Sequence, residues 1–248
     1  MKNSMDELFV IKDKVLISYD ADKNDMQQKI TIPEDVLIIN EGVFAEHEEI
    51  SEVTFPSRLL GIANSAFESS GLTKAVLPDT IKRLGTDVFY DCTELESVVL
   101  PSNLEEIPEN FFAGCSVLDD INLPDGIKTI GFEAFSACLS LSKILIPSSV
   151  KNIGKNAFYN CIGLKKAIIN AGIRKLPAGA FFGCKQLEYI ELPDTLLEID
   201  EEAFCDCKSL KEIKFGKNIK AIANNAFKNC KVKLIIDGDE AKIADNKN

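Results

Sequence analysis

The chain has 248 residues, with 28 Lys and Arg against 39 Asp and Glu and a formal net charge of -11. This acidic balance argues against binding to nucleic acid or to an anionic membrane surface, because both attract basic proteins. Hydrophobic residues make up 46% of the chain, which is enough for a continuous core and argues against a disordered chain. No stretch approaches the roughly 20 apolar residues of a spanning helix, so we expect no membrane insertion.

The first 29 residues stand outside the pattern that fills the rest of the chain. Residues 8–11 and 14–19 are two β-prone runs separated by polar residues, a combination that predicts a β-hairpin. Residues 20–25 are a polar loop. A stack of repeats has an open apolar end that needs an atypical cap. We therefore interpret residues 1–29 as an N-terminal hairpin cap.

From residue 30 to residue 231 the chain repeats one pattern nine times. Residues 144–166 show it: apolar-x-apolar-Pro, two further apolar residues three apart, then Ala-Phe-x-x-Cys-x-x-Leu. The recurring aromatic residues are Phe44, Phe67, Phe89, Phe112, Phe135, Phe158, Phe181, Phe204 and Phe227. Their spacing is 23 residues, except for 22 between Phe67 and Phe89. Such a period is typical of a solenoid, in which each repeat forms one coil and buries its apolar edge against its neighbours.

Within each coil the pattern predicts three segments. In residues 96–101 the inward residues Val98 and Leu100 are apolar, and the run ends in Pro101. This pattern predicts a strand that ends at the Pro, because Pro has no N–H to donate to the neighbouring strand. Val150 and Ile153, three residues apart, fit either a short second strand or a 3₁₀-like segment. Residues 156–161 are expected to form a single helical turn on the outer side. Nine coils stacked at about 4.8 Å would give a body about 45 Å long.

The unit Leu95-x-x-Val98-x-Leu100 matches the frame of leucine-rich repeats. With the Pro, the Ala-Phe pair and the Cys that follow, it resembles the BspA-like class of that family over residues 30–231. The resemblance implies an α/β fold: a right-handed solenoid of nine coils, with one parallel β-sheet face and short strand, 3₁₀ or helical turns on the other side. Members are largely bacterial and protist surface or secreted proteins, some implicated in binding other proteins or cells. The resemblance therefore implies protein binding, and it brings no shared active site.

After Cys230 the repeat pattern fades. Residues 232–237 are expected to form a closing strand, and residues 238–248 a polar tail with little to bury. The expected domain organisation is thus a cap at 1–29, nine leucine-rich repeats at 30–231, and a closing strand with its tail at 232–248.

Most cysteines recur at the 23-residue spacing and would form a line along the solenoid. They are Cys92, Cys115, Cys138, Cys161, Cys184, Cys207 and Cys230. Metal ligands converge on one point, and a disulfide needs Cβ atoms about 3.8 Å apart, closer than in-register strands bring them. We therefore expect a ladder of free, buried thiols without metal or redox chemistry. Cys205 lies outside the ladder, one residue after Phe204, and is expected to face solvent.

His47 is the only histidine and takes the Cys position of the first repeat, three residues after Phe44. Proton transfer needs a partner and a pocket, and no nucleophile is placed with this residue, so we interpret it as a core residue near the cap. The chain has no Gly-rich phosphate loop, no clustered zinc spacing and no calcium loop. We expect no enzyme activity, no cofactor and no metal.

The outward strand positions contain one candidate protein-binding surface. Val76, Val99, Leu145 and Ile168 form an apolar stripe there, and Lys143, Lys166 and Tyr189 border its later part. An apolar stripe with a charged rim is typical of protein-contact sites. The alternative is that these residues reflect only the preference of β-branched side chains for strands.

These observations favour a non-enzymatic protein-binding or adhesion-type module that presents its sheet face to a protein partner. The alternative is an intracellular interaction scaffold or a structural spacer with no surface role. The family resemblance suggests the cell surface or secretion, whereas residues 1–12 contain no apolar run of signal-peptide length and favour the alternative. The compartment therefore stays open. We expect the chain to be a monomer.

Overall fold

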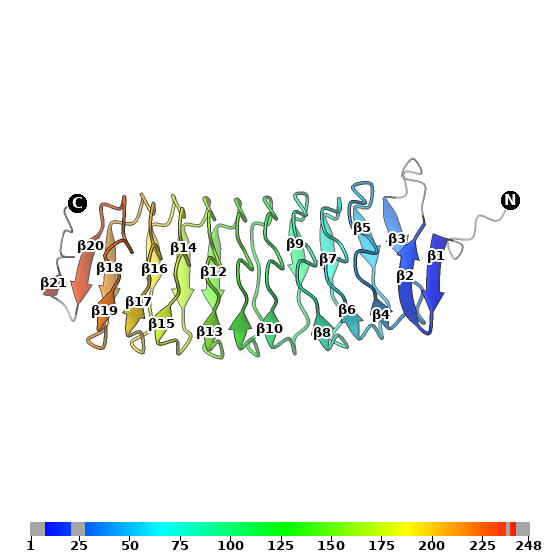
Figure 1. Ribbon diagram of the computed structural model, residues 1–248, viewed down its shortest axis with the longest axis horizontal. Coiled ribbons are helices and arrows are strands. Elements are labelled where there is room, and N and C mark those ends of the chain that lie inside the picture. Colours follow the sequence, from blue (N-terminus) through cyan, green and yellow to red (C-terminus); the bar gives the residue numbers. More distant parts are fainter. Residues whose placement is uncertain (1–7, 21–27, 237–238, 242–248) are drawn as a thin grey trace.

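A computed structural model describes residues 8–20, 28–236 and 239–241. The chain forms an elongated solenoid whose coils are stacked from the N-terminal to the C-terminal end (Figure 1). A typical coil contributes one strand to a first sheet, one two-residue strand to a second sheet, and a turn segment that leads back to the first sheet. The loop expected at residues 20–25 lies almost wholly outside the described residues, as do residues 1–7 of the expected cap.

A β-hairpin lies at the N-terminal end of the stack. Strands β1 (Phe9–Lys12) and β2 (Val15–Tyr19) form an antiparallel pair. On its other side, β2 pairs in parallel with β4 (Ile38–Ile39), the first strand of the second sheet. Asp13 and Lys14 have φ values of 50° and 65°, as a tight two-residue hairpin turn requires. The hairpin therefore extends the second sheet by two strands and covers the first coil.

The first sheet consists of short strands in parallel register, joined in three groups. Its strands are β3 (Lys29–Thr31), β5 (Glu52–Thr54), β7 (Lys74–Val76), β9 (Ser97–Val99), β12 (Lys143–Ile146), β14 (Lys166–Ile169), β16 (Tyr189–Glu191), β18 (Glu212–Phe215) and β20 (Lys233–Ile236). The groups are β3 to β9, β12 to β16, and β18 with β20 and β21 (Asp239–Ala241). Along most of these strands, buried residues alternate with more exposed ones, so every second side chain enters the core.

The C-terminal strand β21 pairs antiparallel with β20. Residues 239–241 of the expected polar tail therefore belong to the sheet, and the rest of the tail lies outside the described residues. The domain limits at residues 29 and 231 remain a prediction.

Beyond the hairpin, the second sheet is built from two-residue strands. After β4 it contains β6 (Gly61–Ile62), β8 (Arg83–Leu84), β10 (Glu106–Ile107), β11 (Thr129–Ile130), β13 (Asn152–Ile153), β15 (Lys175–Leu176), β17 (Glu198–Ile199) and β19 (Ala221–Ile222). These strands are also joined in three groups: β4 to β8, β10 to β13, and β15 to β19. Of the two alternatives left open for the segment of Val150 and Ile153, the short second strand forms at Asn152–Ile153, and Val150 lies just before it.

The helical turn expected at residues 156–161 and the α/β class are not confirmed: this segment forms consecutive β-turns, and the described residues contain no α-helix. Asn156 and Asn160 have φ values of 57° and 54°, whereas an α-helix needs an unbroken run of right-handed residues. The Phe158 N–H between them donates 2.9 Å to the carbonyl of Ala180 in the next coil. The protein is thus a β-solenoid in which the turn segments also join coil to coil.

The same left-handed conformation recurs two residues before and two residues after the repeated Phe in most coils. The residues that adopt it are Gly42, Glu46, Ser65, Ser69, Asp87, Asp91, Asn110, Gly114, Glu133, Ala137, Asn156, Asn160, Gly179, Gly183, Glu202, Asp206 and Asn229. Most are Gly, Asn or Asp, the residue types that tolerate this region best.

The repeated Phe side chains form a continuous column through the core. Neighbouring rings from Phe44 to Phe227 lie 4.9 to 5.8 Å apart between centroids and stack with nearly parallel planes. These rings are buried, and each contacts the ring of the next coil. One coil alone would leave both faces of its ring exposed, so the stability of each coil depends on its neighbours.

The cysteine ladder runs beside this column. Each repeated thiol donates a hydrogen bond of 2.9 to 3.2 Å to the carbonyl of the Phe one coil earlier, as Cys161 does to Phe135. All eight cysteines are free. Burial raises the pKa of Cys92 to about 11 and that of Cys161 to about 12. The thiols are therefore held protonated, which explains why they act as core residues.

In the first two coils the ladder position holds His47 and Ser70. Ser70 Oγ lies 3.5 Å from the Sγ of Cys92, and so continues the ladder. His47 is buried, packs edge-on against the Tyr19 ring of the hairpin at 5.3 Å between centroids, and has Nδ1 2.6 Å from Glu49 Oε1. The histidine thus joins the first coil to the hairpin, as expected of a core residue.

The expectation that Cys205 faces solvent is wrong, because its side chain is only 3% exposed. Other small side chains in the same column, Ala113 and Ser136, are also buried. In these three coils the short side chain is buried, whereas Ala45 of the same column is half-buried and Lys228 is exposed.

We predict that Phe135→Ala destabilises the protein by about 3–5 kcal/mol, the usual cost of removing a fully buried Phe. Because coils stabilise one another, a second unfolding transition can also appear when the two halves are uncoupled. Denaturant unfolding followed by circular dichroism measures both effects. Phe132→Ala is the matched control, because this Phe of the same coil is 40% exposed. A loss below about 1 kcal/mol at Phe135 would contradict the buried column.

We also predict that alkylation of the native protein near pH 8 labels at most Cys230, which is half-buried, while the other seven thiols stay unlabelled. Their raised pKa values and burial withhold the thiolate that reacts. After full unfolding all eight should react. Mass spectrometry counts the labels, and rapid native labelling of the central cysteines would refute the buried ladder.

Candidate protein-binding face

The structure places the apolar stripe predicted from the sequence on the outer face of the first sheet. Val76, Val99 and Leu145 are 65%, 56% and 54% exposed, and Ile168 is half-buried. Each of these four residues lies between two residues whose side chains point into the core. Because successive side chains of a strand point to opposite faces, the four side chains point outward. Large apolar side chains with more than half of their surface exposed are available for contact with a partner.

The stripe is divided into two patches. Val76 and Val99 are direct neighbours on β7 and β9, and Leu145 and Ile168 are direct neighbours on β12 and β14. Between them, residues 119–122 do not form a strand, and the ladder is interrupted there. The sequence Asp-Asp-Ile-Asn at this place is poor in strand-forming residues, which favours a gap here but does not by itself fix its position.

Charged and aromatic side chains border the patch of Leu145 and Ile168. Lys143 forms an ion pair with Asp120 at 3.0 Å, on the side of the interruption. On the other side the Lys166 ammonium lies 5.5 Å from the centroid of the Tyr189 ring. Such exposed contacts contribute about 1 kcal/mol or less each, so their effect is to orient the side chains rather than to stabilise the fold.

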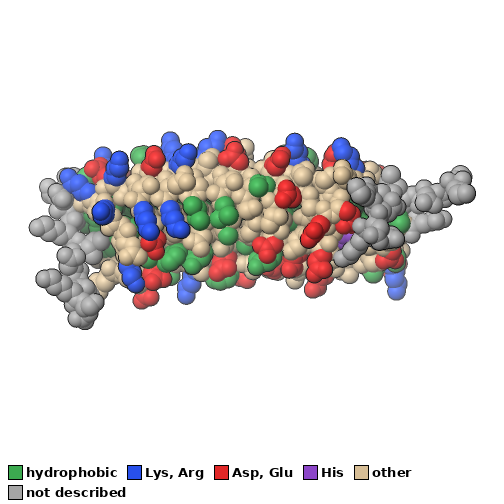
Figure 2. Space-filling view, turned by 90° about the horizontal axis from the view of Figure 1, so that it is seen from above, with side chains coloured by type: hydrophobic (Ala, Val, Ile, Leu, Met, Phe, Trp, Pro, Cys, Tyr) green, Lys and Arg blue, Asp and Glu red, His purple; other side chains and the backbone are tan. Residues whose placement is uncertain are grey.

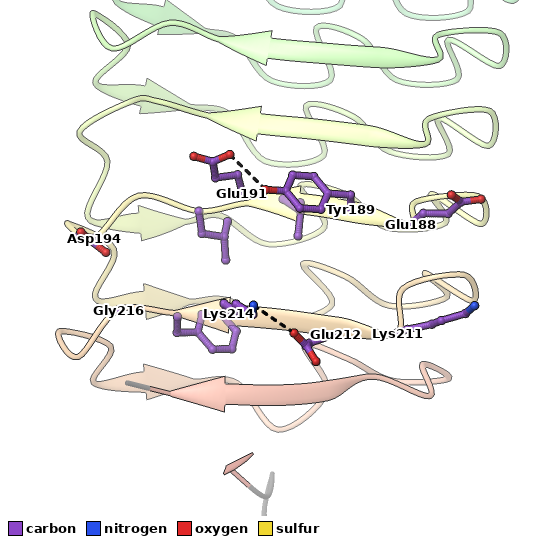
Figure 3. Close-up of a pocket in the computed structure, with 11 residues that line it drawn as sticks. Glu188, Tyr189, Glu191, Asp194, Lys211, Glu212, Lys214 and Gly216 are labelled. Carbon is purple, nitrogen blue, oxygen red and sulfur yellow. Dashed lines mark hydrogen bonds and ion pairs between the residues drawn. The ribbon is translucent and has the colours of Figure 1, made fainter. Parts of the chain in front are cut away.

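A groove of about 420 Å³ opens next to Tyr189, between β16 and β18. These two strands are neighbours in the stack but belong to different hydrogen-bonded groups. Figure 3 shows Tyr189 and Glu191 on one side of the groove and Lys214 and Glu212 on the other. The Tyr189 hydroxyl donates to Glu191 at 3.2 Å, and Lys214 lies 3.5 Å from Glu212.

Gly216 is one of the residues that line the groove. A Cβ atom at Gly216 would lie 2.8 Å from Asp194 Oδ1, so a side chain here would require the Asp194 carboxylate to move. Most other coils have Pro at this position. That departure was the one sequence signal for the groove. Glu191 and Lys214 are not among the binding residues expected from the sequence, and the structure places them on the two walls of the groove.

The groove is lined by apolar, aromatic and charged side chains. Its lining residues are Glu188, Tyr189, Ile190, Glu191, Leu192, Asp194, Lys211, Glu212, Lys214, Phe215 and Gly216, among which Ser, Thr, Cys and His are missing. Within the described parts of the chain, no cluster of three or more His, Cys, Asp or Glu side chains is arranged to hold a metal ion. No helix in those parts is long and apolar enough to span a membrane.

Several solved structures resemble this one. A leucine-rich cell surface protein from Faecalibacterium prausnitzii aligns with a TM-score of 0.56 and 26% identity, over 86% of this chain and 60% of its own. The pneumococcal vaccine antigen PcpA gives 0.59 and 25%, over 84% and 62%. A leucine-rich repeat protein of T. pallidum gives 0.58 and 25%, over 84% and 91%. This chain thus spans about three fifths of the first two proteins. No curated protein sequence matches it.

The sequence itself matches a family model. The model describes the BspA type leucine rich repeat region, with six copies, and it matches residues 16–139 and 105–233. Together these ranges cover well over half of the 248 residues. The repeat unit identified from the sequence is the unit that the model describes, and the chain belongs to the BspA-type leucine-rich repeat family.

Proposed function

We propose that this protein is a non-enzymatic, adhesion-type binding module that presents the outer face of its first sheet to a protein partner. The observation that carries the proposal is the patch of Leu145 and Ile168, two apolar side chains in direct register on an exposed sheet face. Lys143, Lys166 and Tyr189 stand around this patch, and the groove between β16 and β18 continues it.

The arrangement has the anatomy of a contact site. Interfaces place apolar and aromatic residues at the centre and charged residues at the rim, and Tyr is enriched among the side chains that dominate binding energy. Tyr189 is 49% exposed, and its ring is held between Lys166 and Glu191. A partner that offers an apolar side chain to the patch and carboxylates to the two lysines would fit this surface.

The patch of Val76 and Val99 extends the proposed face. It lies two coils away from Leu145, which corresponds to about 10 Å at the spacing of a parallel sheet. A partner that lies along the solenoid would therefore contact both patches. The residues that we propose for binding are Val76, Val99, Leu145, Ile168, Lys143, Lys166 and Tyr189.

The family and the related structures support a surface role. One of the similar proteins is described as a cell surface protein and another as a vaccine antigen. Leucine-rich repeat proteins are generally non-enzymatic binding modules, and the repeat fold presents a long regular face that suits extended contacts. If the protein is instead an intracellular interaction scaffold, it would bind its partner through the same outer face of the first sheet, but inside the cell.

We predict that Leu145→Glu combined with Ile168→Glu weakens partner binding by roughly 30-fold or more, because two carboxylates would be desolvated at the centre of the contact. The intact protein is used to capture and identify a partner, and the affinity of each variant for that partner is then measured. Both side chains point away from the core, so the unfolding midpoint should stay within a few degrees of that of the parent protein.

The matched control is Ile38→Glu with Leu60→Glu, which replaces two similarly exposed apolar residues elsewhere on the solenoid. This control should bind normally. Equal binding by both double variants would overturn the proposed face, and a chain that captures no protein at all would favour the structural spacer.

A further inference from the structure

A second surface runs along the corner where the turn segments lead into the first sheet. It is formed by the two residues that follow the Cys-ladder position in each coil except the second, where Leu72 is buried, and we call it the turn ridge. At its centre Val117, Leu139 and Ile162 lie in three successive coils, where Val117 and Leu139 are 38% and 42% exposed and Ile162 is half-buried. The sheet face of the proposed function lies beside this corner and does not include these residues.

The charges of the turn ridge are graded along the solenoid. Glu48 and Glu94 stand on the N-terminal side of the apolar centre, and Lys185, Lys208 and Lys231 follow in successive coils on the C-terminal side. All five side chains belong to exposed residues. Figure 2 shows this order in the row along the middle of the view: Lys side chains toward the C-terminal end, hydrophobic ones at the centre and acidic ones toward the N-terminal end.

These charges are largely uncompensated within the chain. Among the described residues, Glu48, Glu94, Lys185 and Lys231 form no ion pair, and Lys208 lies 3.7 Å from Asp206. The ridge thus presents a negative half and a positive half to solvent.

We propose that the turn ridge binds a second copy of this chain, antiparallel to the first, with the two-fold axis at Leu139. Leu139 lies in the fifth of nine coils, so this axis pairs the first coil with the ninth and every other coil with its counterpart. Another copy has the same rise per coil, about 4.8 Å, so its ridge can stay in register over the whole length. An ordinary peptide strand or globular surface lacks this matching period.

The antiparallel arrangement brings opposite charges together. Leu139 meets its own copy at the axis, and Val117 lies across from the coil of Ile162. Glu94, two coils from the axis, lies across from the coil of Lys185, and Glu48, four coils from it, across from the coil of Lys231. A parallel arrangement would instead place like charges against each other, which is unfavourable.

The two-fold axis lies across the ridge, so the first sheets of both copies point to the same side of the dimer. The dimer would therefore present two binding faces side by side and leave both open. Because the contact uses a different set of residues, it stands or fails independently of the proposed function.

The net charge of -11 on each copy opposes association. At about 0.1 M salt the Debye length is about 10 Å, so repulsion between distant parts of two such bodies is screened while contact pairs retain their attraction. At about 1 M salt the contact pairs are screened as well. The dimer should therefore be present at about 0.1 M salt and weaken at about 1 M.

The experiment uses the full chain in sedimentation velocity at about 0.1 M and 1 M salt, over protein concentrations up to about 100 µM, where weak interfaces become visible. Lys185→Glu and Glu94→Lys each place like charges across the axis, twice per dimer because of the two-fold symmetry. Each should raise the dissociation constant by about tenfold. The double variant Glu94→Lys with Lys185→Glu exchanges the charges and should restore the affinity of the parent protein.

Lys151→Glu is the control, since it makes the same change in net charge at an exposed position away from the ridge, and it should leave the dissociation constant unchanged. Leu139→Glu places two carboxylates at the axis and should abolish the dimer. A chain that stays monomeric at about 100 µM in about 0.1 M salt would overturn the proposal. So would a double variant that binds no better than the two single variants, because loss without rescue would mean that these residues do not face each other.

Discussion

The contact between one coil and the next is the interaction on which the rest of this protein depends. Each Phe ring of the core column is covered by the rings before and after it, and each ladder thiol donates to a carbonyl of the coil before. The turn segments add backbone bonds such as that from Phe158 to Ala180. A coil without neighbours would expose a ring, a thiol and a row of unpaired amides, so the stack is cooperative along its axis.

This constraint also organises the surface. Residues one period apart form columns along the solenoid. A surface column differs from its surroundings only where the residue types in it change from one coil to the next. The first-sheet column becomes apolar around Leu145, and the two adjacent columns of the turn ridge pass from Glu94 through Val117 and Leu139 to Lys185. Strict repetition of the buried positions holds the coils in register, while the outward positions vary freely. The protein can thus carry separate surfaces for different contacts on one scaffold.

The turn segments show where the sequence prediction and the structure differ. The Ala-Phe-x-x-Cys spacing fits one helical turn, yet left-handed residues at Asn156 and Asn160 prevent it. The recurrence of Gly, Asn and Asp two residues on either side of the Phe was the available signal, because these types tolerate positive φ. Cys205 was misplaced for a related reason: its column carries Tyr90 and Tyr159 as well as small residues, and only stacking shows which of the small ones are covered.

The sequence by itself determined the number of coils, the residues of the core column, the thiol ladder and the outward direction of Leu145 and Ile168, because a strict period decides which side chains share a column. Only the tertiary structure decided where the first sheet is interrupted. The gap at residues 119–122 and the groove between β16 and β18 depend on whether backbone groups of separate coils come within hydrogen-bonding distance. That distance is a property of two coils packed together, and no single repeat encodes it.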